Sequence, residues 1–339
     1  MTIKDIARIS GVSVSTVSRV LNDHPDVSPA CREKVLAVIR ESNYIPNNSA
    51  RDLVRTNSDA IGLVIRGISN PFYTDIIHAI EGEIERRGYT MVMQQIADCD
   101  DEIKCGAVME REKRLRGIVF LGGSFDYKPL DIRLLNVPFV CCSYSNQYGT
   151  LQPNEYSSVS IEDRETARAA TEYLIERGHR RIAALVSRKD DCSISQLRYQ
   201  GYCEALRQYG ITPDDNLIIS AETFDIHGAY CAMAEKLRQN ADFSAVFAIS
   251  DNMALGAMRA LREAGKKVPD NCSVIAIDGL EVSDYVYPPL TTLCQPTAEM
   301  GRRSAQLLLD IIEGKGKNQQ ECLPTSLRVG ASVKARNES

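Results

Sequence analysis

The sequence has no long apolar run, few histidines and no paired cysteine motif, and each absence excludes a class of protein. No apolar stretch approaches the length of a bilayer-spanning helix, and the N-terminus, MTIKDIARIS, has no apolar signal-peptide core. The 11 cysteines form no C-x-x-C pair and no zinc spacing with histidine, which indicates reduced, mostly buried thiols. We therefore expect a cytoplasmic protein with no membrane contact, no metal and no cofactor.

Catalytic motifs are missing as well. The sequence contains no G-x-S-x-G, H-E-x-x-H, Walker A or G-x-G-x-x-G pattern, and its four histidines stand in no acid–base array. The glycine-containing turn LGGSFD at 121–126 is only a weak candidate for a phosphate cradle. We therefore predict no catalytic residue and no enzyme.

The composition is that of a globular protein of two or three domains. Of 339 residues, 44% are hydrophobic and 25% are charged, which excludes disordered and collagen-like chains. The net charge of -5 argues against non-specific coating of nucleic acid. The first 55 residues are an exception, with eight cations against six acids, so any contact with nucleic acid is local.

Three short helices are predicted at the N-terminus. Gly11 supplies a sharp turn after the first, and Ser13 caps a second helix that ends near residues 22–23. Ser28 followed by Pro29 opens a third helix that runs to about residue 43. This spacing matches an all-α helix-turn-helix.

The second helix has an unusual free face, with hydroxyl groups and one arginine but no acid. In a helix-turn-helix this helix enters the major groove, where acidic side chains would repel the phosphates. Arg19 can bond guanine O6 and N7, and Val14 and Ser15 lie in the first turn, where bases are read. The alternative is an ordinary surface helix of low charge.

A polar segment, YIPNNSARDLVRTNSD, follows the three helices. One interpretation of NNSARDLVRT is a plain flexible tether. The other is a short hinge helix that orders on DNA and wedges Leu53 between base steps of the minor groove. Composition alone favours the tether.

From residue 60 onward, short β-rich runs alternate with amphipathic helical segments. The runs include IGLVI, GIVFL, PFVCC, RIAALV and AVFAIS. Alternation of this kind predicts parallel, doubly wound α/β sheets, and about ten strands predict two such lobes. Ligands bind at the carboxyl ends of such strands, so we expect a small molecule in the cleft between the lobes.

The stretch TIKDIARISGVSVSTVSRVLN resembles the headpiece of the lac repressor/gal repressor family of bacterial transcription regulators. The likeness continues in colinear order through IGLVIRGISNPFY, SDNMALGAMRAL and PPLTTLCQPTAEMG, so that it covers essentially the whole chain. The resemblance implies a core like the periplasmic sugar-binding proteins. It also implies a repressor that binds a near-palindromic operator as a homodimer, under the control of a small-molecule effector.

The resemblance further implies a domain order. The headpiece would span 1–47 and the hinge 48–60, the N-lobe 61–160 and 291–321, and the C-lobe 161–290 and 322–339. The tail beyond residue 322 has no leucine heptads, so we expect a dimer rather than a tetramer. The helical stretch 72–87 is a candidate dimer face or, alternatively, one flank of the internal core.

Roles in DNA binding carry over from the family by position. Base contacts are implied for Val14, Ser15 and Arg19, with Leu53 as the minor-groove lever. Phosphate contacts are implied for Thr2, Ser13, Thr16, Ser18, Asn22, Ser28, Tyr44 and Asn47. Asp52 stands where family members usually carry an uncharged residue, and near phosphate it weakens binding.

Effector contacts are implied in the same way. The matching positions are Phe72, Tyr73, Ser143, Asp163, Arg198, Phe224, Ser250, Asp278 and Gln295. Such a set suits a sugar, a nucleoside or a derivative, because an aromatic ring stacks while Arg and Asp bond hydroxyls. Ser143 and Ser250 replace the Asp and Asn of many sugar-responsive relatives. Arg188 and Lys189 leave room for a phosphorylated or carboxylated effector, although a solvated loop is the simpler interpretation.

Two alternative functions remain open from the sequence. The first keeps the DNA role but replaces the small molecule with a phosphorylated protein co-repressor that docks on the N-lobe. The second is a DNA-tethered enzyme acting on a sugar or nucleotide, which the missing catalytic motifs disfavour.

Overall fold

A computed structural model describes residues 3–21, 24–42, 59–67, 70–97, 100–123, 126–144, 146–187 and 193–336. The chain divides into two compact units, Met1–Ser58 and Asp59–Ser339. The expected hinge, 48–60, lies outside the described residues except for its last two positions.

The first unit has the three predicted helices, α1 (Ile3–Ser10), α2 (Val14–Leu21) and α3 (Pro29–Glu41). They share a small core, in which the side chains of Ile6, Ala7, Val17, Val20 and Val35 are buried. The helical spacing of these residues places all of them on the inward faces. The prediction of an all-α helix-turn-helix is therefore confirmed.

The predicted caps and turn of this unit are also observed. Gly11 has a φ of 64°, the left-handed conformation that glycine adopts without strain. The amide of Thr16 donates to Ser13 Oγ at 3.1 Å, and the amide of Cys31 donates to Ser28 Oγ at 3.4 Å. Each serine thus satisfies an amide that the first turn of its helix leaves without a partner.

The second unit contains two six-stranded sheets, which define an N-lobe and a C-lobe. The N-lobe sheet consists of β1 (Ala60–Arg66), β2 (Thr90–Ile96), β3 (Gly117–Leu121), β4 (Phe139–Cys142), β5 (Ser157–Ser160) and β11 (Gln320–Cys322). The C-lobe sheet consists of β6 (Ile182–Val186), β7 (Ile218–Ser220), β8 (Ala245–Ala248), β9 (Ser273–Asp278), β10 (Thr291–Cys294) and β12 (Ser326–Arg328). The strand orders are β11-β5-β4-β3-β1-β2 and β12-β10-β9-β8-β6-β7. All neighbours are parallel except β10 and β12, which confirms two doubly wound lobes.

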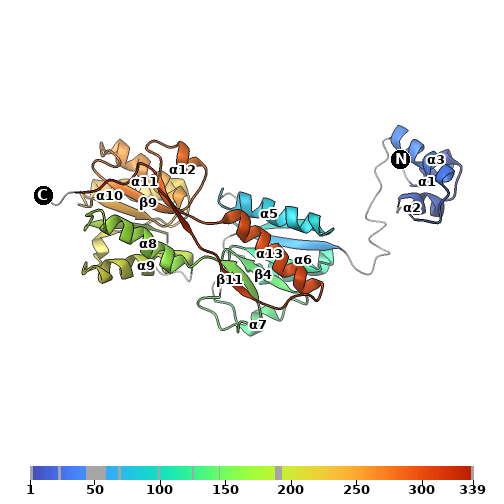
Figure 1. The fold of residues 1–339 in the computed structure, drawn as a ribbon, viewed down its shortest axis with the longest axis horizontal. Helices are drawn as coiled ribbons and strands as arrows, with labels where there is room; N and C mark the ends of the chain where they lie inside the picture. Colours follow the sequence, from blue (N-terminus) through green and yellow to red (C-terminus); the bar gives the residue numbers. More distant parts are fainter. Residues whose placement is uncertain are drawn as a thin grey trace. The chain divides into compact units, whose positions relative to one another are not determined.

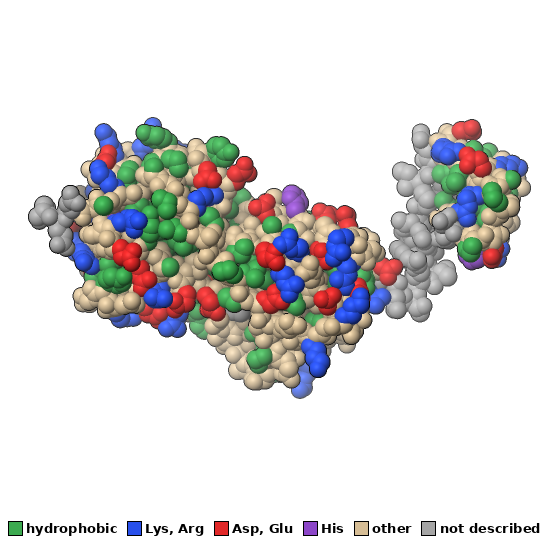
Figure 2. Space-filling model, viewed as in Figure 1, with side chains coloured by type: hydrophobic (Ala, Val, Ile, Leu, Met, Phe, Trp, Pro, Cys, Tyr) green, Lys and Arg blue, Asp and Glu red, His purple; other side chains and the backbone are tan. Residues whose placement is uncertain are grey.

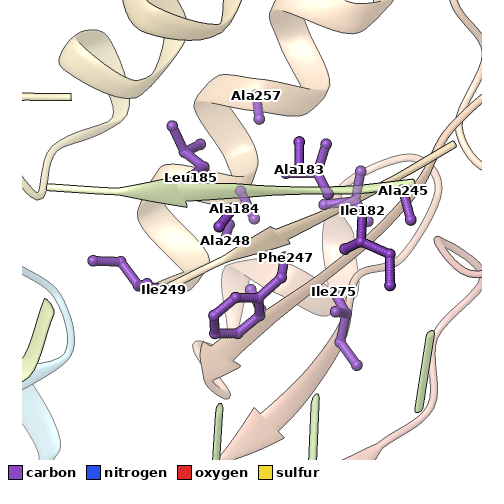
Figure 3. Close-up of a cluster of buried hydrophobic side chains, with 14 of the residues drawn as sticks. Ile182, Ala183, Ala184, Leu185, Ala245, Phe247, Ala248, Ile249, Ala257 and Ile275 are labelled. Carbon is purple, nitrogen blue, oxygen red and sulfur yellow. The ribbon is translucent and has the colours of Figure 1, made fainter. Parts of the chain in front are cut away.

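The central strands are buried because helices cover both faces of each sheet. Every residue of β3, β6 and β8 is buried, as their uninterrupted apolar sequences predict. Figure 3 shows part of the C-lobe core, where Leu185, Phe247 and Ile275 lie among small alanines of β6 and β8.

The helices alternate with the strands. In the N-lobe they are α5 (Tyr73–Arg86), α6 (Glu102–Lys113), α7 (Pro129–Ile132) and α13 (Thr297–Ile312). In the C-lobe they are α8 (Asp163–Ile175), α9 (Ile194–Gln208), η1 (Asp215–Leu217), α10 (Ile226–Arg238), α11 (Asp251–Glu263) and α12 (Val282–Tyr285). The late helix α13 thus returns to the N-lobe, where it lies beside α5 (Figure 1).

Helix α5 is the segment that we considered as a dimer face. Ile76, Ile80 and Ile84 are fully buried in the N-lobe core. The helix approaches α13 so closely that a Cβ at Gly301 would lie 2.4 Å from the carbonyl oxygen of Ile76. The apolar side of α5 therefore forms one flank of the internal core, and only its polar side is exposed.

One expected boundary between the lobes is wrong. We placed 291–321 in the N-lobe, but Thr291–Cys294 forms β10 of the C-lobe sheet, parallel to β9. Cys322, which we placed in the C-lobe, ends β11 of the N-lobe sheet. The sequence of a four-residue strand such as TTLC does not indicate the sheet to which the strand belongs. Its place in the C-lobe sheet follows only from its pairing with Ile275–Asp278. The chain passes between lobes after β5, after β10 and after β11.

Candidate DNA-binding surface and ligand site

The free face of α2 carries the residues expected to meet DNA. Val17 and Val20 are buried, so Val14, Ser15 and Arg19 are left exposed on the other side. No acidic residue occurs in the first turn, where the partial positive charge of the helix favours an anion. Arg19 forms no ion pair with any residue that the structure describes. This surface has the charge and shape to approach a phosphate backbone.

The expected phosphate contacts are placed unevenly. Ser13 Oγ caps α2 and lies 2.7 Å from Ser15 Oγ and 2.8 Å from Thr16 Oγ1, so these hydroxyls form one cluster at the helix start. Ser28 caps α3, and Ser18 is half-buried. The remaining predicted contacts lie outside the described residues: Thr2, Asn22, Tyr44, Asn47 and Leu53.

Four of the predicted effector residues come together at the carboxyl edge of the C-lobe sheet. Asp163 begins α8, Arg198 lies in α9, Asp278 ends β9 and Gln295 follows β10. All four are buried, and the Arg198 side chain is only 2% exposed. Parallel strands end at the same edge of a sheet, which brings residues far apart in sequence into contact.

The Arg198 guanidinium lies between two carboxylates. Its Nε donates to Asp163 Oδ1 at 2.8 Å, and its Nη1 lies 3.4 Å from Asp278 Oδ1 and also donates to the carbonyl of Ile249. Gln295 Nε2 donates to the same Asp278 oxygen at 2.8 Å. This network offers a ligand both carboxylate acceptors and guanidinium donors in a fixed geometry.

Acids outnumber cations in this buried cluster. Burial raises the pKa of Asp163, and it raises the pKa of Asp278 to about 7, where the nearby carboxylate of Asp251 adds to the effect. Arg198 opposes both shifts because its positive charge favours the ionised carboxylates. A neutral ligand rich in hydroxyl groups suits this environment better than an anion does.

Two predicted aromatic residues of the N-lobe follow the first strand. Phe72 is buried in the N-lobe core. Its ring packs edge-on against the ring of Tyr73, with 5.4 Å between the ring centroids. Burial raises the pKa of Tyr73, the carboxylate of Asp278 raises it further, and Arg198 lowers it. The charges of the C-lobe cluster therefore act on the Tyr73 hydroxyl. A Cβ at Gly122 would lie 2.7 Å from the Tyr73 hydroxyl.

The other three predicted effector residues occupy different settings. Phe224 is half-buried against the C-lobe core. Ser143 follows β4 with a φ of 64°, and its amide donates to the carbonyl of Val159. Ser250 is buried and accepts the amide of Met253 at 3.3 Å as the cap of α11.

Sequence reasoning missed three asparagine and aspartate residues near this site. Asn252 Nδ2 donates to Asn70 Oδ1 at 3.1 Å, which joins the start of α11 in the C-lobe to the loop after β1 in the N-lobe. Asp251 is fully buried, and its charge raises the pKa of Asp278. The polar pair Asp-Asn directly after a predicted buried strand was the available signal.

A buried polar cluster was also missed at the carboxyl edge of the N-lobe sheet. Glu102 accepts hydrogen bonds from Arg66 Nη2 at 2.5 Å and from the hydroxyl of Tyr127, which also lies 3.1 Å from the Tyr144 hydroxyl. A Cβ at Gly123 would lie 2.5 Å from Glu102 Oε1, so a larger residue there would displace this carboxylate. The cluster joins the end of β1 to the segments that follow β2, β3 and β4.

A cavity of about 230 Å³ opens beside the charged cluster. Asp163 and Leu197 of the C-lobe form part of its wall, and Gln147 and Tyr148, between β4 and β5 of the N-lobe, form another part. Side chains of both lobes therefore line a space next to the Arg198 network.

Arginines on the N-lobe surface pair with neighbouring acids. The pairs are Arg86 with Glu83, Arg87 with Glu313, Arg302 with Glu299 and Arg303 with Glu321. Figure 2 shows such cations and acids interspersed over the region of α5 and α13. This face therefore presents no concentrated positive charge to a phosphorylated partner.

The described part of the chain offers neither a metal-binding cluster nor a membrane-spanning helix. No described group of three or more His, Cys, Asp or Glu side chains is arranged to hold a metal ion. No helix within the described ranges has the length and apolar character needed to cross a membrane.

Two family models match the chain. The model for bacterial regulatory proteins of the lacI family matches residues 2–47. The model for a periplasmic binding protein-like domain matches residues 171–333. The first match falls on the helix-turn-helix, and the second covers most of the C-lobe together with α13 and β11 of the N-lobe.

Relatives are similar over nearly their whole length. The chain is 42% identical over 331 residues to the HTH-type transcriptional regulator MalR of Clostridium butyricum, covering 96% of this chain and 97% of MalR. A solved complex of the transcriptional regulator CelR with cellobiose matches with a TM-score of 0.72 and 32% identity over 98% of this chain and 99% of CelR. A lac repressor dimer bound to operator and the anti-inducer ONPF matches with a TM-score of 0.82 and 28% identity, covering 99% of both chains.

Proposed function

Because this chain belongs to the lacI family of bacterial regulatory proteins, we propose that it is a repressor whose DNA affinity is controlled by a sugar-like effector. It is a transcriptional regulator with a DNA-binding helix-turn-helix. The proposal adds a homodimer, a near-palindromic operator and an effector site between the two lobes. The single observation that carries the effector site is the buried Arg198 network with Asp163, Asp278 and Gln295.

In this proposal α2 enters the major groove. Arg19 reads a base through two parallel hydrogen bonds, while Val14 and Ser15 contact base edges near the helix start. Leu53 acts as a wedge in the minor groove. The hydroxyl cluster of Ser13 and Thr16 and the other predicted phosphate contacts, Thr2, Ser18, Asn22, Ser28, Tyr44 and Asn47, set the orientation on the duplex.

Exposed apolar side chains support the homodimer. Tyr285 and Tyr287 are 79% and 92% exposed at the end of α12, and Val282 in the same helix is also exposed. In the N-lobe, Met93 on the edge strand β2 and Val108 on α6 are exposed as well. Exposed apolar groups of this kind are candidates for an interaction surface, and a two-fold dimer matches the symmetry of a palindromic site. The solved lac repressor relative is a dimer on its operator.

The chemistry of the cluster supports a neutral, polyhydroxylated effector. Arg198 is already paired with two carboxylates, so its charge is not available to neutralise an anionic ligand. Hydroxyl groups can donate to the carboxylates and accept from the guanidinium, while Phe224 and Tyr73 offer ring faces. The CelR relative was solved with cellobiose, which has this chemistry. Ser143 and Ser250 would add weaker hydroxyl contacts.

Control requires that the effector bind two arrangements of the lobes with different affinity. Both lobes contribute to this region, since Asn252 of the C-lobe donates to Asn70 of the N-lobe and the charge of Asp278 acts on Tyr73. A ligand held between them therefore favours one relative angle. In a dimer, a change of that angle alters the spacing of the headpieces and hence the fit to both half-sites.

The two alternative functions have less support. The paired arginines of the N-lobe disfavour a phosphoprotein co-repressor on α5 and α13. The relatives are named as transcriptional regulators, which disfavours a DNA-tethered enzyme.

Selection of duplexes from a random DNA library by the purified full-length chain tests the proposal. We expect enrichment of an inverted repeat, and we expect a change in its affinity upon addition of cellobiose or ribose. Fluorescence anisotropy measures both. A library that shows no enriched sequence at moderate salt, with and without the sugars, contradicts the DNA role.

A further inference from the structure

Asp251 is a fully buried carboxylate that the proposed effector contacts do not use. Its exposed fraction is 0%. Oδ2 accepts the amide of Leu280 at 2.8 Å and the hydroxyl of Ser283 at 2.7 Å, and Oδ1 accepts the hydroxyl of Thr292 at 2.6 Å. A buried carboxylate with several donors is expensive to replace, because each donor then loses its partner.

These donors stand close in sequence to the effector residues. Leu280 follows Asp278 by two positions, and Thr292 precedes Gln295 by three. Asp251 itself lies between Ser250 and Asn252, which bonds to Asn70 of the N-lobe. One carboxylate thus ties the start of α11 to the segment after β9, which carries Asp278, and to β10, which leads to Gln295.

The segment that Asp251 holds has a strained backbone. Asp278 has a φ of 139°, a conformation that residues with a side chain rarely adopt, and Gly279 follows with a φ of 80°. Such a conformation persists only where the surroundings hold it. From the opposite side, Arg328 Nη2 donates to the carbonyl of Leu280 at 2.7 Å. The loop is therefore held between α11 and β12.

The same loop also reaches the other lobe. The Leu280 side chain is buried in the N-lobe core cluster, which contains Phe72 and against which Tyr73 packs. The amide of Leu280 is bonded to Asp251 while its side chain contacts the N-lobe. The position of this leucine and the position of the Asp278 carboxylate are thus set by one short stretch of chain.

From this geometry we infer that Asp251 is a positioning residue that couples the effector carboxylate Asp278 to the contact between the lobes. It touches the effector at no point; it holds Asp278 and Leu280 in one fixed relation. Ligand contact at Asp278 therefore moves Leu280 against the N-lobe. This inference rests on the proposed effector site and extends it to the closure of the lobes.

Asp251→Asn in the full chain tests the inference by hydrogen–deuterium exchange. The substitution keeps an acceptor for Thr292 but turns an amide donor toward the Leu280 amide. We expect exchange in 278–284 and in 70–76 to become about tenfold to hundredfold faster, with 182–186 and 245–248 unchanged. Glu110→Gln is the matched control, because Glu110 is a buried N-lobe carboxylate that accepts the amide of Asn136.

Binding provides the functional readout. We expect Asp251→Asn to raise the Kd of whichever sugar binds the native chain, cellobiose or ribose, about tenfold or more, and to leave operator affinity without sugar unchanged. Leu280→Ala keeps the hydrogen bonds of Asp251 and should loosen 70–76 without loosening 278–284. Ser283→Ala removes one of the three hydrogen bonds to Asp251. This milder variant replaces Asp251→Asn in the same measurements if Asp251→Asn does not fold.

Several outcomes overturn the inference. Unchanged exchange in 278–284 removes the positioning role, and a uniform increase over the whole chain reduces Asp251 to a general stabilising residue. Faster exchange with unchanged sugar Kd removes the coupling. If neither sugar binds the native chain, the proposed effector class fails, while the exchange pattern still decides the role of Asp251.

Discussion

Effector affinity should depend on pH through Asp278. Burial and the carboxylate of Asp251 raise the pKa of Asp278 to about 7, while Arg198 and the Gln295 hydrogen bond oppose the shift. The charge of Asp278 also acts on Tyr73 of the N-lobe, where it raises the pKa of the phenol. Sugar hydroxyls donate hydrogen bonds most strongly to an ionised carboxylate, so the effector prefers the ionised form. Binding therefore releases a proton, and affinity rises as the pH rises.

The size of the effect follows from the pKa. With a pKa of about 7, about a tenth of the Asp278 carboxyls are ionised at pH 6 and about nine-tenths at pH 8. If only the ionised form binds, the sugar Kd falls about tenfold between these two values. Isothermal titration calorimetry in buffers of different ionisation enthalpy should also count nearly one proton released per sugar at pH 6.

Control variants separate this cause from others. Asp278→Asn should flatten the pH profile, because the side chain no longer titrates, and should weaken binding at pH 8. Glu110→Gln should keep the native profile, since that buried carboxylate lies in the N-lobe away from the cluster. A sugar Kd that is constant from pH 6 to pH 8, or that rises with pH, would refute the reasoning.

Three further predictions concern other parts of the chain. Arg19→Ala should weaken binding to the selected operator by about 1–3 kcal/mol and relax specificity at one base pair, as measured by anisotropy titration. Arg40→Ala is the control, because Arg40 is an exposed headpiece arginine that forms an ion pair with Glu33. Gly279→Ala should lower the free energy of unfolding by about 1–3 kcal/mol, measured by urea denaturation, because φ is 80° and a Cβ would lie 2.6 Å from Cys294 Sγ. An unchanged urea midpoint contradicts the assigned backbone. Tyr285→Glu with Tyr287→Glu should produce monomers in sedimentation, whereas Leu130→Glu, at an exposed leucine of α7, should not.

The headpiece could be predicted from local sequence because local interactions determine it. Gly11 supplies the left-handed turn, and Ser13 and Ser28 cap helices within three residues of themselves. The central strands were equally clear, since burial on both faces requires continuous apolar runs. The assignment of Thr291–Cys294 failed because four residues with two threonines carry no mark of the sheet to which they pair.

The site depended on the family resemblance rather than on local pattern. Asp163 and Arg198 are 35 residues apart, and Arg198 and Asp278 are 80 residues apart, so only the topology of the sheet brings them together. Asp251 was missed because a helix-starting Asp usually caps its own helix. Here its carboxylate instead accepts from Leu280, Ser283 and Thr292, three donors outside α11.

The contacts between the lobes are of a size that a small ligand can shift. A coupling of about 1–3 kcal/mol is typical of regulated proteins, and burial of one leucine contributes about 1.5–3 kcal/mol. Leu280 and Leu197 of the C-lobe both pack on N-lobe core clusters, and Asn252 bonds to Asn70 across the same junction. Leu280 lies two residues from Asp278, so a ligand that repositions this carboxylate also changes the contact of Leu280 with the N-lobe. The free energy of that contact is as large as the coupling free energy that regulation requires. The lobes themselves are rigid sheets, so a change of this size alters their angle rather than their internal structure.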